Sequence, residues 1–208
     1  LDRTVFYGES GGQVGDNGAL VGKDKIFTVS DTKKTAGGVV THLGTLDKGI
    51  LSVGDTVIAE INTARRDAIR RNHTAAHLLQ AALRKVLGTH VEQAGQLVNE
   101  FAVRFDFTHF SALSAEEIAQ VEEFVNKAIL DGIDIENTEM PIEEAKKLGA
   151  MALFGEKYGN IVRVVNIPGR SVELCGGTHA ANTAKLGLFK IISEASVAAG
   201  VRRIEAVT

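Results

Sequence analysis

The spacing of hydrophobic positions divides the chain into an early part with strand-like runs and a later part that mixes helices with strands. Before about residue 62, short runs rich in Val, Ile and Thr alternate with Gly-containing turns. The runs that predict strands lie at residues 26–31, 39–45 and 56–61. Because short strands at this spacing are typical of small barrels, we predict a small N-terminal β-barrel domain over residues 1–63.

From about Ala64 the hydrophobic positions recur at helical spacing. The residues that would share one face of a first helix are Ile69, Ala76, Leu79, Leu83 and Val86. Gly88 predicts the end of this helix. A second helix is predicted to begin at a capping box formed by Ser114 and Glu117, and to end at Gly132.

The remaining pattern predicts one short helix and several strands. Pro141 suits the first position of a helix that Gly149 ends. Strands are predicted at residues 101–107, 161–167, 186–192 and 201–207. Since helices mix with strands that are not adjacent in the chain, the predicted class is α+β, with residues 64–208 as an α+β domain that follows the barrel.

Charge is unevenly distributed along the chain. The 208 residues carry a formal charge of −3, which gives no global indication of nucleic-acid binding. Residues 111–147 carry −7, which leaves +4 for the rest, and four arginines gather before the first histidine pair: Arg65, Arg66, Arg70 and Arg71. A polyanion would be attracted to that side, although a solvated helix start explains these arginines equally well.

Composition indicates in which cellular compartment the protein is expected. No apolar run approaches the roughly 18 residues of a membrane span, so we expect no membrane partner, and no signal peptide is visible. The single cysteine, Cys175, excludes an intrachain disulfide and favours a reducing compartment, which predicts a cytoplasmic protein. The first residue is not Met, so we expect a piece of a longer protein.

Two short motifs carry candidate chemistry. His73 and His77 lie four residues apart on the first predicted helix, so both imidazoles can point at one spot. Cys175 and His179 are also four apart, separated by two glycines that let the backbone turn tightly. Together they supply three imidazoles and one thiol, enough ligands for one tetrahedral Zn²⁺.

The role of this predicted zinc stays open at this point. Four protein ligands are typical of a closed structural site, whereas a catalytic site keeps one position open for water or substrate. Metallopeptidases of the H-E-x-x-H type carry a general-base Glu after the first His, and here that position is Thr74. A peptidase is therefore a poor interpretation.

The two metal motifs resemble the zinc signature of alanyl- and threonyl-tRNA synthetase editing domains. Several other short sequence segments resemble alanyl-tRNA synthetases of the bacterial or organellar type. They run from Phe6 to Gln13, from Asn72 to Leu79, from Leu87 to Val91, from Ala150 to Gly159 and from Val201 to Val207. The resemblance covers essentially the whole chain.

The resemblance implies a function. Alanyl-tRNA synthetases mischarge their tRNA with serine and glycine, because a pocket cannot strongly reject an added hydroxyl or a smaller amino acid. A second site hydrolyses the wrong ester. The implied activity is therefore deacylation of tRNA for alanine that carries serine or glycine, with the remainder of the synthetase chain as a partner and Zn²⁺ held by His73, His77, Cys175 and His179. The ligand count favours a zinc that positions the substrate over one that activates water.

Further residues are candidates for the reaction. Gln13, in the Gly11-Gly12-Gln13 run, can orient a water or the ester, and Thr74 can contact the serine hydroxyl. Glu156, with its neighbour Lys157, can contact the tRNA end or the acyl group. Glu173 can orient a metal ligand. The alternatives are an ordinary turn, a helix-surface hydroxyl, a salt bridge and an exposed carboxylate, respectively.

Two other functions fit the same motifs. A free-standing hydrolase of the same superfamily would clear mischarged tRNA with identical chemistry. A non-catalytic, zinc-stabilised nucleic-acid-binding module would use the four-ligand site only for folding.

Overall fold

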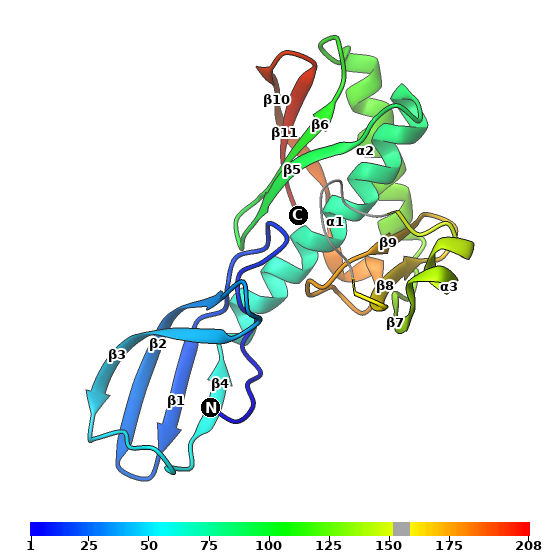
Figure 1. The fold of residues 1–208 in the computed structure, drawn as a ribbon. Helices are drawn as coiled ribbons and strands as arrows, with labels where there is room; N and C mark the ends of the chain where they lie inside the picture. The colour runs from blue at the N-terminus through cyan, green and yellow to red at the C-terminus, as the bar shows by residue number, and fades with distance from the viewer. Residues whose placement is uncertain (152–158) are drawn as a thin grey trace.

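Three antiparallel sheets and two long helices make up the fold in a computed structural model of the chain, which describes residues 1–151 and 159–208. The first sheet contains β1 (Gly18–Gly22), β2 (Lys25–Lys34), β3 (Val40–Lys48) and β4 (Ile58–Ile61), in the order β3-β2-β1-β4. It lies at one end of the molecule, and α1 (Thr63–Leu87) connects it to the rest (Figure 1).

The prediction of an N-terminal β-barrel is wrong, because the N-terminal sheet does not close. β3 and β4 are the two edges of an open sheet, and no pairing joins them among the described residues. Four strands give too short a circumference to close around packed side chains, and this sheet buries only a thin core of Phe6, Leu20 and Val29. The α+β class is confirmed, because helices and antiparallel sheets alternate along the chain. The division into two domains at residue 63 stays a prediction.

The second sheet carries the main hydrophobic core. Its strands are β5 (Gln93–Val98), β6 (Val103–Thr108), β10 (Lys190–Ala198) and β11 (Val201–Val207), in the order β10-β11-β6-β5. Helices α1 and α2 (Ala115–Leu130) pack against it, so that Leu79, Leu83, Phe105 and Phe107 are fully buried. This packing gives α1, and whatever side chains it carries, a rigid support.

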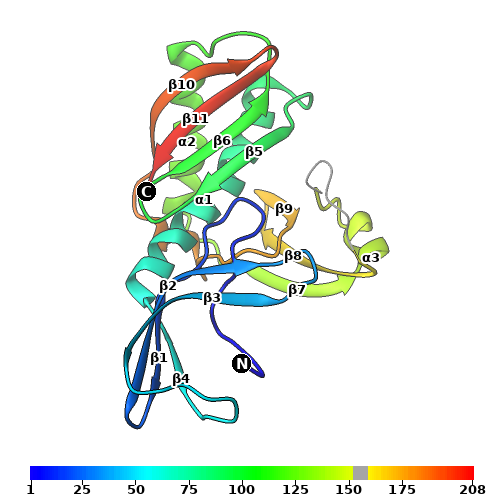
Figure 2. The ribbon, with the colours of Figure 1, turned by 60° about the vertical axis from the view of Figure 1, so that its left-hand side comes forward.

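The third sheet is small and lies beside the middle of α1. It contains β7 (Glu136–Pro141), β8 (Ile161–Ile167) and β9 (Ser171–Leu174), with the short helix α3 (Ile142–Lys147) packed on it through Ala145. Figure 2 shows this sheet next to the N-terminal loop that precedes β1. None of the helices in the described ranges is long and apolar enough to cross a membrane.

The local signals placed the helices well and some strands poorly. Asn62 caps α1 by accepting from the Arg65 amide, and the Ser114–Glu117 capping box of α2 is present in both directions. Pro141 is the cap rather than the first residue of α3. The strand predicted at residues 186–192 is wrong in its first half. Residues Thr183–Leu186 form a 3₁₀ turn, and the buried Leu186 and Phe189 follow a spacing of three rather than two.

Candidate metal centre

Helix α1 presents the first histidine pair. His73 and His77 lie one turn apart, and their side chains are almost fully buried, with 1% and 4% exposure. Their ring centroids are 5.4 Å apart. The two imidazoles therefore share the face of α1 that points into the molecule, beside the residues of the main core.

The second pair comes from the loop after β9. Cys175 and His179 face the histidines of α1, and the four candidate ligand atoms all lie within 4.8 Å of one another. The Cys175 sulfur is 3.6 Å from His73 Nε2 and 3.3 Å from His179 Nε2. Ligands around a tetrahedral zinc are separated by roughly 3.3–3.8 Å, given zinc–ligand bonds of about 2.0–2.3 Å. Segments a hundred residues apart thus form one group that can hold a metal ion.

Burial keeps the three imidazoles neutral, as metal ligation requires. Loss of hydration, with a smaller contribution from the positive charge of Arg163, lowers the pKa of His73 to about 3. Burial is also the main cause that lowers the pKa values of His77 and His179, with smaller contributions from neighbouring histidines and Arg163. The ring nitrogens consequently keep their lone pairs available at neutral pH.

His77 shows most directly that the group fits a cation. Its Nδ1 atom is buried and has no hydrogen-bond partner in the described structure, while its Nε2 atom lies 3.6 Å from a Glu173 carboxylate oxygen. A buried ring nitrogen without a partner is unfavourable, and a bound metal ion supplies interactions that the protein alone lacks here. The donor set and this unsatisfied nitrogen together fit a zinc ion.

Glu173 is buried rather than exposed. Its side chain accepts a 2.6 Å hydrogen bond from Ser171 Oγ and faces His77. Burial raises its pKa to about 7, although the Ser171 hydrogen bond opposes the shift. A carboxylate beside a ligating histidine orients the ring, so the structure places Glu173 where it can position His77.

Gln13 is fully buried and contacts the candidate metal ligand His73 directly. Its Oε1 atom accepts from His73 Nδ1, at 2.7 Å, and from the Thr178 amide, at 2.8 Å. Its Nε2 atom donates to the Thr178 hydroxyl. These bonds leave His73 Nε2 as the nitrogen that faces Cys175. Gln13 therefore holds a ligand and the ligand loop in place, and a direct contact with substrate stays a prediction.

Thr74 has a comparable position on the other side of the cluster. Its hydroxyl is buried, accepts from the Ala180 amide at 3.1 Å and lies 3.2 Å from His179 Nδ1. It thus orients His179, and its predicted contact with a serine hydroxyl is not tested. Glu156 and Lys157 lie outside the described residues.

The two glycines of the ligand loop differ in what they do. A Cβ atom added to Gly177 would lie 2.1 Å from His73 Cε1 and 2.9 Å from Gln13 Oε1, whereas one added to Gly176 would meet nothing within 4 Å. Neither has a positive φ angle. Gly177 is therefore required for close approach of the loop to His73, rather than for a special turn.

Arg163 is a site residue that the sequence patterns missed. It projects from β8 and donates to the Cys175 and Gly177 carbonyls and, at 2.7 Å, to Asn137 Oδ1. It fixes the backbone between the cysteine and the second glycine. The available signal was the one charged residue in a mostly apolar strand, Ile161–Ile167.

The four arginines predicted to attract a polyanion divide into two pairs. Arg66 is buried and paired with Asp16, and Arg65 binds Glu100 and the Gly15 carbonyl. Both attach the N-terminal loop to α1. Arg70 and Arg71 instead line a pocket of about 540 Å³ that reaches His179.

A second pocket opens onto the other side of the cluster. It has a volume of about 410 Å³ and reaches His73 and Cys175. Its walls come from the N-terminal loop, the end of β2 and strand β8, and they include Tyr7, Lys34 and Arg163. This pocket gives a small molecule a path to the candidate metal ligands.

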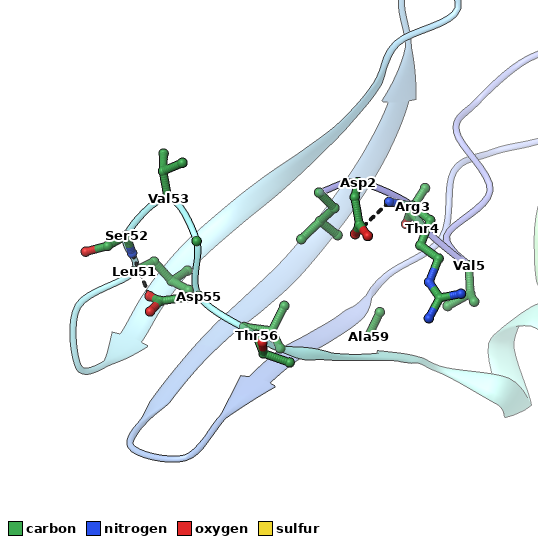
Figure 3. Close-up of a pocket in the computed structure, with 13 residues that line it drawn as sticks. Asp2, Arg3, Thr4, Val5, Leu51, Ser52, Val53, Asp55, Thr56 and Ala59 are labelled. Atoms are coloured by element: carbon green, nitrogen blue, oxygen red, sulfur yellow. Dashed lines mark hydrogen bonds between the residues drawn. The ribbon is translucent and has the colours of Figure 1, made fainter.

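A larger hollow lies away from the cluster. It has a volume of about 1130 Å³ and lies between residues 1–5 and residues 51–59 (Figure 3). Its polar side chains already have protein partners: Asp2 accepts from the Arg3 amide, and Asp55 accepts from the Ser52 amide and pairs with Lys25. None of the candidate metal ligands lines it, so size alone does not identify the site.

Comparison with known proteins agrees with these motifs. Residues 162–205 match the family described as the threonyl and alanyl tRNA synthetase second additional domain, and residues 1–65 match the class II (A) tRNA synthetases. The whole chain is 59% identical to alanine–tRNA ligase 1 of Lachnoclostridium phytofermentans, and 56% and 53% identical to the alanine–tRNA ligases of Dichelobacter nodosus and Bacillus velezensis.

The extent of these matches defines what is shared. Each covers 100% of this chain but only 24% of the relative's length. The similarity is thus to one region of a much longer protein, and it spans the segments of this chain that carry both candidate metal motifs. On its sequence over that region, the chain belongs to the family of bacterial alanine–tRNA ligases.

Proposed function

We propose that this chain is the editing part of an alanine–tRNA ligase and hydrolyses the ester of tRNA for alanine that carries serine or glycine. The observation that carries the proposal is the His73–His77–Cys175–His179 group at the end of an accessible pocket. The match of residues 162–205 to the synthetase second additional domain supports it.

The pocket and its cluster suit an acylated RNA end. A volume of about 410 Å³ lies within the range of small-ligand sites, roughly 300–1,000 Å³, and so accommodates an aminoacyl group with part of a ribose. A Zn²⁺ ion held by the four side chains would polarise the ester carbonyl or bind the substrate amine. With four protein ligands, we favour positioning of the substrate over activation of water.

The residues around the cluster then act as positioning residues. Gln13 fixes the ring of His73, Thr74 that of His179 and Glu173 that of His77. Arg163 holds the loop between Cys175 and Gly177. Glu156 is proposed to contact the tRNA end or the acyl group.

Partners and location follow from the same assignment. The proposed partners are tRNA for alanine with its mischarged end, and the remainder of the synthetase chain, which the relatives' greater length supports. Residues 1–63 and 64–208 are proposed as two domains, and the cytoplasm as the compartment.

The test is deacylation of seryl-, glycyl- and alanyl-tRNA for alanine by the zinc-loaded protein. We expect rapid loss of serine and glycine and slow loss of alanine. Cys175→Ala and His77→Ala should lower bound zinc and deacylation together, because each removes a ligand. His90→Ala, outside the cluster, is the control and should change neither.

A variant that keeps its zinc but loses activity would contradict the ligand assignment. An intact ester with wild-type protein would favour a non-catalytic binding module.

A further inference from the structure

We propose that Lys34 binds the phosphate of the terminal nucleotide as the acylated RNA end enters the 410 Å³ pocket, an assignment that rests on the proposed function. Lys34 is the last residue of β2 and lines the same pocket as His73 and Cys175. Lys34 therefore lines the same small cavity as the side chains that would meet the ester.

The charge of the pocket wall favours an anion. Two cationic side chains, Lys34 and Arg163, line it, and the described lining contains no acidic side chain. The Arg163 guanidinium already donates to Cys175, Gly177 and Asn137, so its positions are fixed by the protein. A bound Zn²⁺ would add to the positive potential, and an anionic group of the substrate would be attracted into the pocket.

Lys34 differs from its neighbour in how its charge is used. Lys33 forms ion pairs with Glu9 and Asp31, which raise its pKa. Lys34 is exposed and makes no ion pair with any residue that the structure describes. Since successive side chains of a strand point to opposite faces, only one of the two lysines lines the pocket.

The substrate offers one anion at the right place. The amino acid is esterified to the ribose of the last nucleotide, and the nearest negative charge is the phosphodiester on the other side of that ribose. With the ester at the metal ligands, this phosphate lies toward the pocket mouth. A lysine at the wall supplies a charge-assisted hydrogen bond to it.

The basic pocket on the opposite side of the cluster is the competing entrance. Arg70, Arg71 and Lys185 line it with His179, but so does the acidic Asp67, which pairs with Arg70. Cys175 is absent from the residues that line it. We therefore assign the RNA end to the pocket of Lys34.

The experiment compares two esters that differ in phosphate, using zinc-loaded protein. One is seryl-tRNA for alanine, and the other is seryl-adenosine, which carries the same ester without a phosphodiester. For Lys34→Ala we expect KM for the RNA substrate to rise about tenfold and its salt dependence to weaken by about one phosphate contact, with hydrolysis of seryl-adenosine unchanged. Lys34→Arg should restore most of the affinity for RNA.

The control variants separate the possible failures. Lys33→Ala should leave both substrates unaffected, because its charge is already paired. An unchanged KM for RNA in Lys34→Ala, or an equal loss on both esters, would overturn the assignment while leaving the proposed hydrolysis intact. A selective loss on RNA in Lys185→Ala alone would place the entrance on the other side. If wild-type protein hydrolyses neither ester, the proposed function fails, and this assignment fails with it.

Discussion

The N-terminal sheet and the α1–α2 half of the molecule are held together in different ways. In the second, α1 and α2 bury Leu83, Phe105 and their neighbours against a four-stranded sheet. In the first, β3 is mostly exposed, and the buried core is limited to Phe6, Leu20 and Val29. The first sheet is thus poorly stabilised by apolar burial alone.

The loop that leads into the N-terminal sheet compensates through polar contacts. Asp16 is buried against Arg66 of α1, and Gln13 is buried against His73 and Thr178. The backbone around Gln13 also pairs with Val98 at the end of β5. The N-terminal part therefore supports the candidate metal ligands through a few buried hydrogen bonds. The other half supports them through rigid packing of α1.

The largest expected effect comes from the main core. Phe105→Ala should reduce the free energy of unfolding by about 3–5 kcal/mol, because it leaves a large cavity beside α1. Val29→Ala in the first sheet should cost less, about 1–3 kcal/mol, and should leave the helical signal of α1 intact. Chemical denaturation followed by circular dichroism measures both, and equal effects would contradict the contrast between the two cores.

The next effect tests the polar attachment. Asp16→Ala leaves Arg66 buried without its partner, which should cost about 3–5 kcal/mol locally and detach the N-terminal loop from α1. Hydrogen exchange should then increase over residues 8–17. Asp55→Ala removes a more exposed ion pair with Lys25 and serves as the control, with an expected change of about 0–1 kcal/mol. Unchanged exchange in Asp16→Ala would show that the loop is held by other contacts.

A smaller effect is expected from the ligand loop. Gly177→Ala should displace His73 and weaken metal binding by at least about tenfold, since the added Cβ overlaps the imidazole. Gly176→Ala, one residue earlier, has open space and should bind metal like the wild type. Competition with a chromogenic chelator measures the affinities. Equal affinities in the two variants would contradict the close approach of Gly177 to His73.

An effect of comparable size is expected from Gln13. Gln13→Ala should reduce zinc affinity by about 10–100-fold without unfolding the main core, because His73 Nδ1 loses its acceptor. Gln13→Glu keeps an acceptor oxygen and should retain more affinity than Gln13→Ala. If both variants bind zinc as tightly as the wild type, the N-terminal loop does not support the metal group.

Local sequence signals predicted the helices and the two pairs of candidate ligands. The Ser114 capping box, the Gly88 end of α1 and the four-residue spacing of His73 and His77 depend on neighbours within a turn. Such signals can be read from the chain alone. That His73 meets Cys175 depends on packing between segments a hundred residues apart, and the sequence indicated it only through motifs that resemble a family.

The missed features are those that depend on long-range partners. Strands β5, β7 and β9 are short or polar, so their pairing in a sheet rather than their pattern defines them. The barrel prediction failed because spacing predicts strands but not whether the outer two meet. Arg163 was missed because its bonds go to backbone carbonyls of the ligand loop, which have no side-chain signature.

The most direct test of the account is a zinc titration of metal-free protein with seryl-tRNA deacylation measured at each point. We predict that activity rises in proportion to bound zinc and reaches its maximum at one ion per chain. In Cys175→Ala, neither tight zinc binding nor activity should return. Full deacylation by the metal-free protein, or stoichiometric zinc without any deacylation, would contradict the claim that these four side chains form an editing centre.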